Sequence, residues 1–232
     1  MLECFSSDRP SLSLTDLASV TQLPVPTAWR LVHGLVALGY LSRNEVKRYQ
    51  PTVRTLALTQ GSLGRLAFLN PYPRLGALAS ETGVGWVMHV LDGLETAVVA
   101  FGFAHPIAMD TTPLGQRFPA LTYAPGLAIA AFLPDAEREM LLDRFGLPRP
   151  SAARETMEEQ LRLVAEAGIA AVDNPPLAVV AAPILDFQGR PVASIAVVAY
   201  FADATSNRLR ERWGTSVKQV ARELSAELGF TR

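Results

Sequence analysis

The sequence contains few of the residues from which catalytic and metal sites are usually built. It has one cysteine, Cys4, and three histidines, His33, His89 and His105. A single cysteine excludes a disulfide within the chain, which fits a reducing compartment, and no two histidines stand at metal-ligand spacing. No Gly-x-Ser-x-Gly elbow, Walker loop or complete Gly-x-Gly-x-x-Gly motif is present. We therefore expect no enzyme activity, no cofactor and no metal ion.

Long apolar runs and targeting segments are also missing. The longest apolar runs, such as residues 127–133 and 195–201, are too short to span a bilayer. The opening Met-Leu-Glu-Cys-Phe lacks the basic start and apolar stretch of a secretory signal. With 49% hydrophobic and 19% charged residues, the chain has enough apolar material to bury a core. These features predict a cytoplasmic protein with no membrane partner.

Charge is distributed unevenly along the chain. The net charge is −1, yet residues 1–60 hold six basic and four acidic side chains, whereas the remainder holds 15 basic and 18 acidic ones. A mildly basic N-terminal part on an acidic body suits contact with an anionic polymer through the N-terminal part.

Residues 1–53 show the pattern of a winged helix-turn-helix domain. Ser13 and Asp16 have the spacing of a capping box at the start of a first helix, and Pro26 suits the first turn of a second. Gly39 would end that helix, and a short basic hairpin would follow around residues 43–46. The side chains expected in the core are Leu14, Leu17, Ala18 and Val20 of the first helix, and Ala28, Leu31, Val32, Leu35 and Leu38 of the second.

In such a domain the second helix enters the major groove of DNA and the wing lies along the backbone. Arginine reads guanine or binds phosphate, whereas wing cations mainly position the protein on phosphates. An alternative interpretation is a helical hairpin used for protein contacts, with Trp29 in its core. The candidate DNA-binding residues are Pro26, Thr27, Trp29, Arg30, His33, Arg43, Lys47 and Arg48.

The rest of the chain predicts a connector helix and an α+β domain. Residues 54–70 have apolar side chains at helical spacing and end before Pro71 and Pro73, which stop a helix. In residues 71–232, hairpin signals alternate with helical patterns, which favours a mainly antiparallel sheet. Strands are expected at 84–91, 95–103, 178–185 and 191–201, and helices at 74–82, 126–132, 135–145, 152–167 and around 213–228.

An ordered set of short motifs resembles the IclR family of bacterial regulators. It includes Leu-Thr-Asp-Leu-Ala at 14–18, Thr-Ala-Trp-Arg-Leu at 27–31, Gly-Gln-Arg-Phe-Pro at 115–119 and Ala-Ala-Pro-Ile at 181–184. The resemblance implies a winged helix-turn-helix, a linker helix and a GAF-like effector domain. It also implies a homodimer or homotetramer that binds double-stranded, palindromic operator DNA. It places Met1 inside the family's first helix, so either this helix is shortened or the start lies upstream.

The resemblance also implies an effector pocket on one face of the C-terminal sheet. A helix turn at Gly126 would offer backbone N–H groups to a carboxylate. Apolar side chains at 179, 196 and 198 suggest an apolar pocket, and segments 117–121 and 200–201 resemble those of relatives that control aromatic-compound catabolism. This resemblance implies an aromatic or other largely apolar carboxylic acid as effector and control of catabolic genes; the alternative is ordinary sheet core without a cavity. Two other functions stay open: a sensor or partner-binding module that has lost the ability to bind DNA, and a small-molecule enzyme. The implied lining is Ala124, Gly126, Leu127, Val179, Ala181, Ala196 and Val198.

Overall fold

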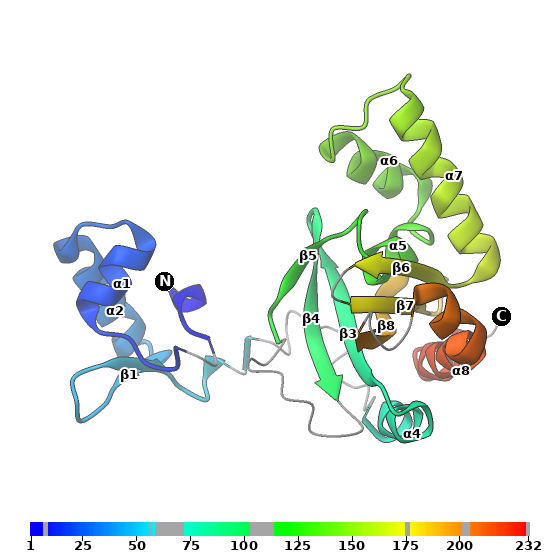
Figure 1. Ribbon diagram of the computed structural model, residues 1–232. Coiled ribbons are helices and arrows are strands. Elements are labelled where there is room, and N and C mark those ends of the chain that lie inside the picture. Colours follow the sequence, from blue (N-terminus) through cyan, green and yellow to red (C-terminus); the bar gives the residue numbers. More distant parts are fainter. Residues whose placement is uncertain are drawn as a thin grey trace. The chain divides into compact units, whose positions relative to one another are not determined.

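The computed structural model shows two compact units (Figure 1). It describes residues 1–6, 9–55, 57–58, 72–102, 114–174, 177–200 and 205–230. The N-terminal unit is described to residue 58 and the C-terminal unit from residue 72. The connector helix expected at 54–70 lies mostly outside the described residues.

The N-terminal unit is a winged helix-turn-helix. A 3-10 turn, η1 (Leu2–Cys4), precedes helices α1 (Leu14–Thr21) and α2 (Val25–Ala37) and the hairpin β1 (Leu41–Arg43) and β2 (Tyr49–Pro51). The expected capping box is present: the Asp16 N–H donates to Ser13 Oγ (3.1 Å), and the Ser13 N–H donates to the Asp16 carboxylate (2.9 Å).

The core of this unit is smaller than the helical spacing predicted. Val20, Leu31 and Leu38 were expected to be buried, but they are 47%, 47% and 58% exposed. The reason is geometric: Ala28 and Val32 mark the centre of the buried stripe of α2, and Leu31 and Leu38 lie on its flank. A unit of this size covers only a narrow stripe of each helix. The core cluster consists of Cys4, Leu12, Leu17, Val32, Leu41 and Tyr49.

The C-terminal unit is built on a six-stranded antiparallel sheet with the order β5-β4-β3-β8-β7-β6. The expected α+β class with an antiparallel sheet is therefore confirmed. The two edge strands, β5 and β6, were not predicted; each pairs on one side only and carries no strong apolar alternation. The strands are β3 (Gly85–Asp92), β4 (Glu95–Gly102), β5 (Arg117–Pro119), β6 (Ala170–Asn174), β7 (Leu177–Leu185) and β8 (Pro191–Tyr200).

Helices cover both faces of this sheet. On one face lie α4 (Tyr72–Thr82) and α8 (Ser206–Glu227), and on the other lies the short helix α5 (Ala124–Ala130), as Figure 1 shows. The start of α8 is fixed by Asp173 of β6, whose carboxylate accepts a hydrogen bond from the Ser206 N–H at 2.6 Å. A carboxylate at a helix N-terminus also favours the helix electrostatically.

Helices α6 (Asp135–Arg144) and α7 (Ala152–Ala167) are joined by a buried arginine. Arg154 donates to Glu158 at 2.8 Å, to Asp143 at 2.5 Å and to the Leu147 carbonyl oxygen at 2.7 Å, and it also pairs with Glu139. Hydrogen bonds from Arg149 and Arg154 hold the pKa of Glu158 below its usual value. The α6–α7 pair is thus held together by charge as well as by apolar packing.

Candidate DNA interface and effector face

The outward side of α2 carries an unpaired arginine. Arg30 is exposed, and no described residue pairs with its guanidinium group. Trp29 is 48% exposed and its ring lies 4.2 Å from the ring of His33, so Trp29 is not the core residue of a helical hairpin. Pro26 is exposed in the first turn of the same helix, and Thr27 is half-buried beside it. This side of α2 therefore presents a cation and an aromatic pair to solvent.

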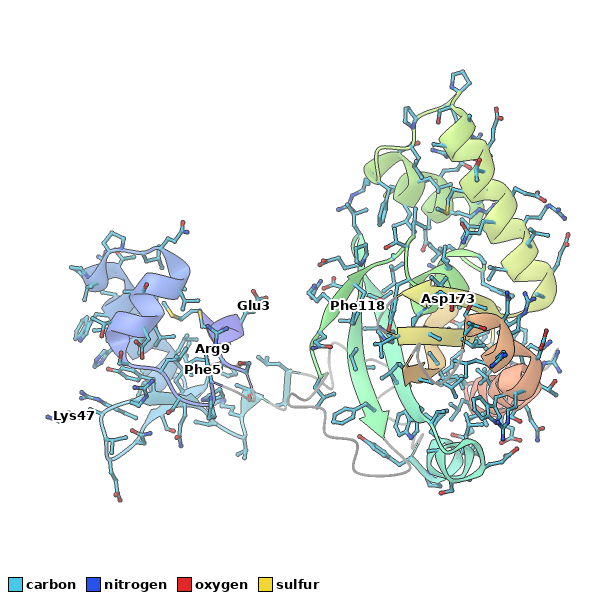
Figure 2. All side chains as sticks on the ribbon, in the orientation of Figure 1. Glu3, Phe5, Arg9, Lys47, Phe118 and Asp173 are labelled. Carbon is cyan, nitrogen blue, oxygen red and sulfur yellow. The ribbon has the colours of Figure 1, made fainter. Side chains whose placement is uncertain are left out.

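The wing presents two further cations. Lys47 occupies the turn between β1 and β2 in the left-handed region (φ 61°), and its side chain projects away from the unit (Figure 2). Its N–H donates to the Asn44 carbonyl oxygen at 3.0 Å. The Arg43 guanidinium lies 5.6 Å from the centre of the Tyr49 ring, an arrangement that leaves its charge at the surface.

Arg48 is placed differently from the other predicted DNA contacts. Its guanidinium pairs with Asp16 at 3.0 Å and donates to the Ser11 carbonyl oxygen at 3.1 Å. Asp16 is the capping carboxylate of α1, and hydrogen bonds from Ser13, with the charge of Arg48, hold its pKa below the usual value. Arg48 thus ties the wing to α1, and spacing alone could not distinguish it from a free wing cation.

The residues expected to line the effector pocket come together on the sheet face that α5 covers. The register places Val179, Ala181, Ala196 and Val198 on the same side of β7 and β8. The α5 residues Ala124 and Leu127 pack against this side in one cluster, together with Val87 of β3 and the partly buried Phe101 of β4.

Gly126 has a packing role in this arrangement. A Cβ at this position would lie 2.1 Å from the Ala120 carbonyl oxygen, so only glycine permits the close approach of α5 to the preceding segment.

Two polar residues on the same face were not predicted as site residues. His89 of β3 and Ser194 of β8 are direct cross-strand partners, and both are fully buried. In the sequence His89 alternates with apolar neighbours, and in the structure it lies buried in β3. The sequence signal for Ser194 is a serine in the middle of an otherwise apolar segment, 192–199. Phe118 and Tyr123 lie beside His89, with ring centres 5.8 and 5.6 Å from the imidazole.

The two units therefore define a DNA-binding regulator with a separate C-terminal domain. Residues 1–45 match the IclR helix-turn-helix domain, and residues 68–226 match the bacterial transcriptional regulator IclR C-terminal domain. The chain belongs to the IclR family of DNA-binding transcriptional regulators. No helix in the described part of the chain is long and apolar enough to cross a bilayer. Those residues also hold no cluster of three or more His, Cys, Asp or Glu side chains suited to a metal ion.

Relatives and solved structures resemble the chain over nearly its whole length. The Pca operon regulatory protein of Acinetobacter baylyi is 28% identical, over 97% of this chain and 84% of its own length. The HTH-type transcriptional regulator KipR of Bacillus subtilis is 26% identical, over 96% of this chain and 92% of its own. An IclR homolog from Microbacterium hydrocarbonoxydans, solved in complex with 4-hydroxybenzoate, has a TM-score of 0.78 at 21% identity, covering 98% of this chain and 95% of that one.

Proposed function

We propose that the chain regulates catabolic genes in response to an aromatic or largely apolar carboxylic acid that binds on the sheet face beneath α5. The observation that carries this proposal is the composition of that face, where Val179, Ala196 and Val198 are joined by the aromatic rings of Phe101 and Phe118. A ligand with an apolar ring matches such a surface better than a short polar oxo-acid does.

The relatives support this class of effector. One relative is a Pca operon regulatory protein, and a protein of the same fold was solved with 4-hydroxybenzoate.

Isothermal titration of the full chain with benzoate, 4-hydroxybenzoate, pyruvate and glyoxylate tests the proposal. We expect the ring acids to bind more tightly than the oxo-acids. Binding of the oxo-acids alone would contradict the proposed effector class.

For the DNA contacts, we propose that Arg30 and His33 lie in the major groove and that Arg43 and Lys47 contact phosphates. These side chains are exposed, and among the described residues none forms an ion pair with Arg30; both observations support this assignment. Arg30→Ala should weaken binding to the upstream intergenic DNA by about fivefold to 150-fold, since a good arginine–base pair contributes about 1–3 kcal/mol. The matched control is Arg162→Ala, which removes the same charge from the exposed face of α7. Unchanged specific binding by the Arg30 variant would refute the role given to α2.

We further propose that a homodimer or homotetramer presents two copies of α2 to the halves of a palindromic operator. The effector then acts only if it binds more tightly to one arrangement of the two DNA-binding units than to another. Anisotropy titration of labelled DNA with and without the ring acid measures this coupling. Equal DNA affinity in both conditions would show that the bound acid is not an effector.

A further inference from the structure

His89 and Ser194 place unpaired polar atoms inside the effector face. His89 is opposite Ser194 in the register of β3 and β8, and both side chains are 0% exposed. His89 Nδ1, His89 Nε2 and Ser194 Oγ have no hydrogen-bond partner among the described residues. Alternation along β8 puts Ser194 on the same side as Ala196, and therefore on the face that α5 covers.

Buried polar atoms without partners are unusual because each one loses its hydrogen bonds to water and gains none in return. Ser225 on α8 shows the ordinary arrangement. It is 2% exposed, its hydroxyl accepts from the Leu185 N–H at 2.9 Å, and it donates to the Ala221 carbonyl oxygen at 2.6 Å. His89 and Ser194 therefore present, side by side on one face, hydrogen-bonding atoms that no described residue uses.

The surroundings of this pair suit a flat ring. Phe118 of β5 stacks on Tyr123, the residue that precedes α5, with ring centres 4.4 Å apart and planes inclined by 15°. Both rings approach the His89 imidazole edge-on. An aromatic ligand on this side would meet aromatic surfaces next to the two polar groups.

We propose that His89 and Ser194 form the hydrogen-bonding end of the effector site and select a ring that carries a neutral hydroxyl group. This inference rests on the proposed function, because it assigns the polar contacts of the same effector site. A hydroxyl group matches the pair: it donates to one atom and accepts from another, as a neutral imidazole and a serine together require.

A carboxylate matches the pair less well. Burial lowers the pKa of His89 to about 3, so the imidazole is neutral at physiological pH and offers one N–H donor and one bare nitrogen acceptor. Arg154 is the one buried charged side chain among the described residues, and the carboxylates of α6 and α7 already bind it. A carboxylate beside His89 would therefore be buried without a counter-charge, whereas a hydroxyl carries no such cost.

The test compares benzoate with 4-hydroxybenzoate, which differ by one hydroxyl group, in titrations of the full chain. The wild type should bind 4-hydroxybenzoate about tenfold more tightly than benzoate, as one or two buried hydrogen bonds provide. Ser194→Ala and His89→Phe should each bring this ratio close to one, because each removes a hydrogen-bonding partner of the ligand hydroxyl; the ratio within one variant cancels any change that affects both acids equally. Ser225→Ala is the matched control: it removes a buried serine hydroxyl from α8 and should keep the wild-type ratio.

Thermal unfolding without ligand gives a second measurement, since Ser194→Ala removes an unpaired hydroxyl and Ser225→Ala a paired one. The melting temperature should rise in the first variant and fall in the second. A wild-type ratio near one, or an unchanged ratio in both Ser194→Ala and His89→Phe, would overturn this assignment and leave the proposed function intact. If neither ring acid binds to a chain that still binds DNA, the proposed effector class fails, and this assignment fails with it.

Discussion

Replacing Lys47 by glycine should stabilise the wing and weaken DNA binding at the same time. Lys47 is one of two lysines in the chain. Its φ of 61° places the backbone of Lys47 in the left-handed region, where residues that carry a Cβ are disfavoured. Holding a non-glycine residue there costs roughly 1–2 kcal/mol. Glycine removes this strain, but it loses about 0.5–1 kcal/mol more conformational entropy on folding. The expected net gain in stability is therefore about 0.5–1 kcal/mol.

The effect on DNA binding has the opposite sign. If Lys47 neutralises one phosphate, its loss lowers the slope of log affinity against log salt concentration by about 0.9. Anisotropy titrations of duplex DNA at several salt concentrations measure the slope, and amide hydrogen exchange of the wing measures local stability. Lys47→Arg, which keeps both the charge and the strain, should retain the wild-type values.

Lysine acetylation with and without DNA provides an independent readout. DNA should protect Lys47, whereas Lys218, whose ammonium group donates to the Ala167 carbonyl oxygen at 3.2 Å in the other unit, should react equally in both conditions. Faster hydrogen exchange in Lys47→Gly would refute the strain argument. A salt slope equal to that of the wild type would refute the phosphate contact.

Three further predictions concern stability. Ser13→Ala removes the α1 cap and should cost about 1 kcal/mol in urea unfolding. Gly126→Ala places a methyl group 2.1 Å from a backbone oxygen and should cost about 3 kcal/mol, read as a fall in melting temperature. Glu158 has its pKa lowered by Arg149 and Arg154, so its contribution is present above its ordinary value of 4.5 and is lost as the pH falls through the lowered one. Glu158→Gln should therefore flatten the acid limb of stability against pH.

Each of these has a matched control or a contradicting result. Ser13→Gly should cost only a few tenths of a kcal/mol, because glycine is tolerated at an N-cap. Gly76→Ala in α4, where a Cβ meets nothing within 4 Å, should be neutral or stabilising, and equal losses at Gly76 and Gly126 would contradict the packing argument. An acid limb of unchanged steepness in Glu158→Gln would contradict the role of its ion pairs.

Local sequence signals predicted much of the fold. The capping box of Ser13 and Asp16 and the apolar period of 152–167 depend on neighbours within a few residues, and both appear as predicted. The edge strand β6 (170–174) was not among the predicted strands, because its existence depends on β7 as its partner. The exposure of Leu31 and Leu38 was likewise not predictable from period alone, since it depends on how wide a stripe the small core covers.

The candidate sites were predicted less completely, for related reasons. Arg48 has the sequence context of a wing cation, but its guanidinium group forms an ion pair with Asp16, which is distant in the sequence. The pairing of His89 with Ser194 depends on a register between strands far apart in the chain. The register of β3 and β4 shifts between Met88 and His89, and this shift changes which β4 side chains lie on the same face as His89. The alternation of apolar and polar residues along a strand does not predict such a shift.

The pairing of β3 with β8 also bears on the order in which the two units can form during synthesis. It joins residues more than a hundred positions apart, such as Met88 and Ile195, whereas the wing pairs residues close in sequence, such as Leu41 and Pro51. Closing so long a loop is entropically costly and late, so the DNA-binding unit can form while most of the chain is still being synthesised. A ribosome that stops before β8 would thus release a DNA-binding unit without a completed effector face. Under the proposed function such a fragment could not respond to the effector, so only the full-length chain would couple DNA binding to effector binding.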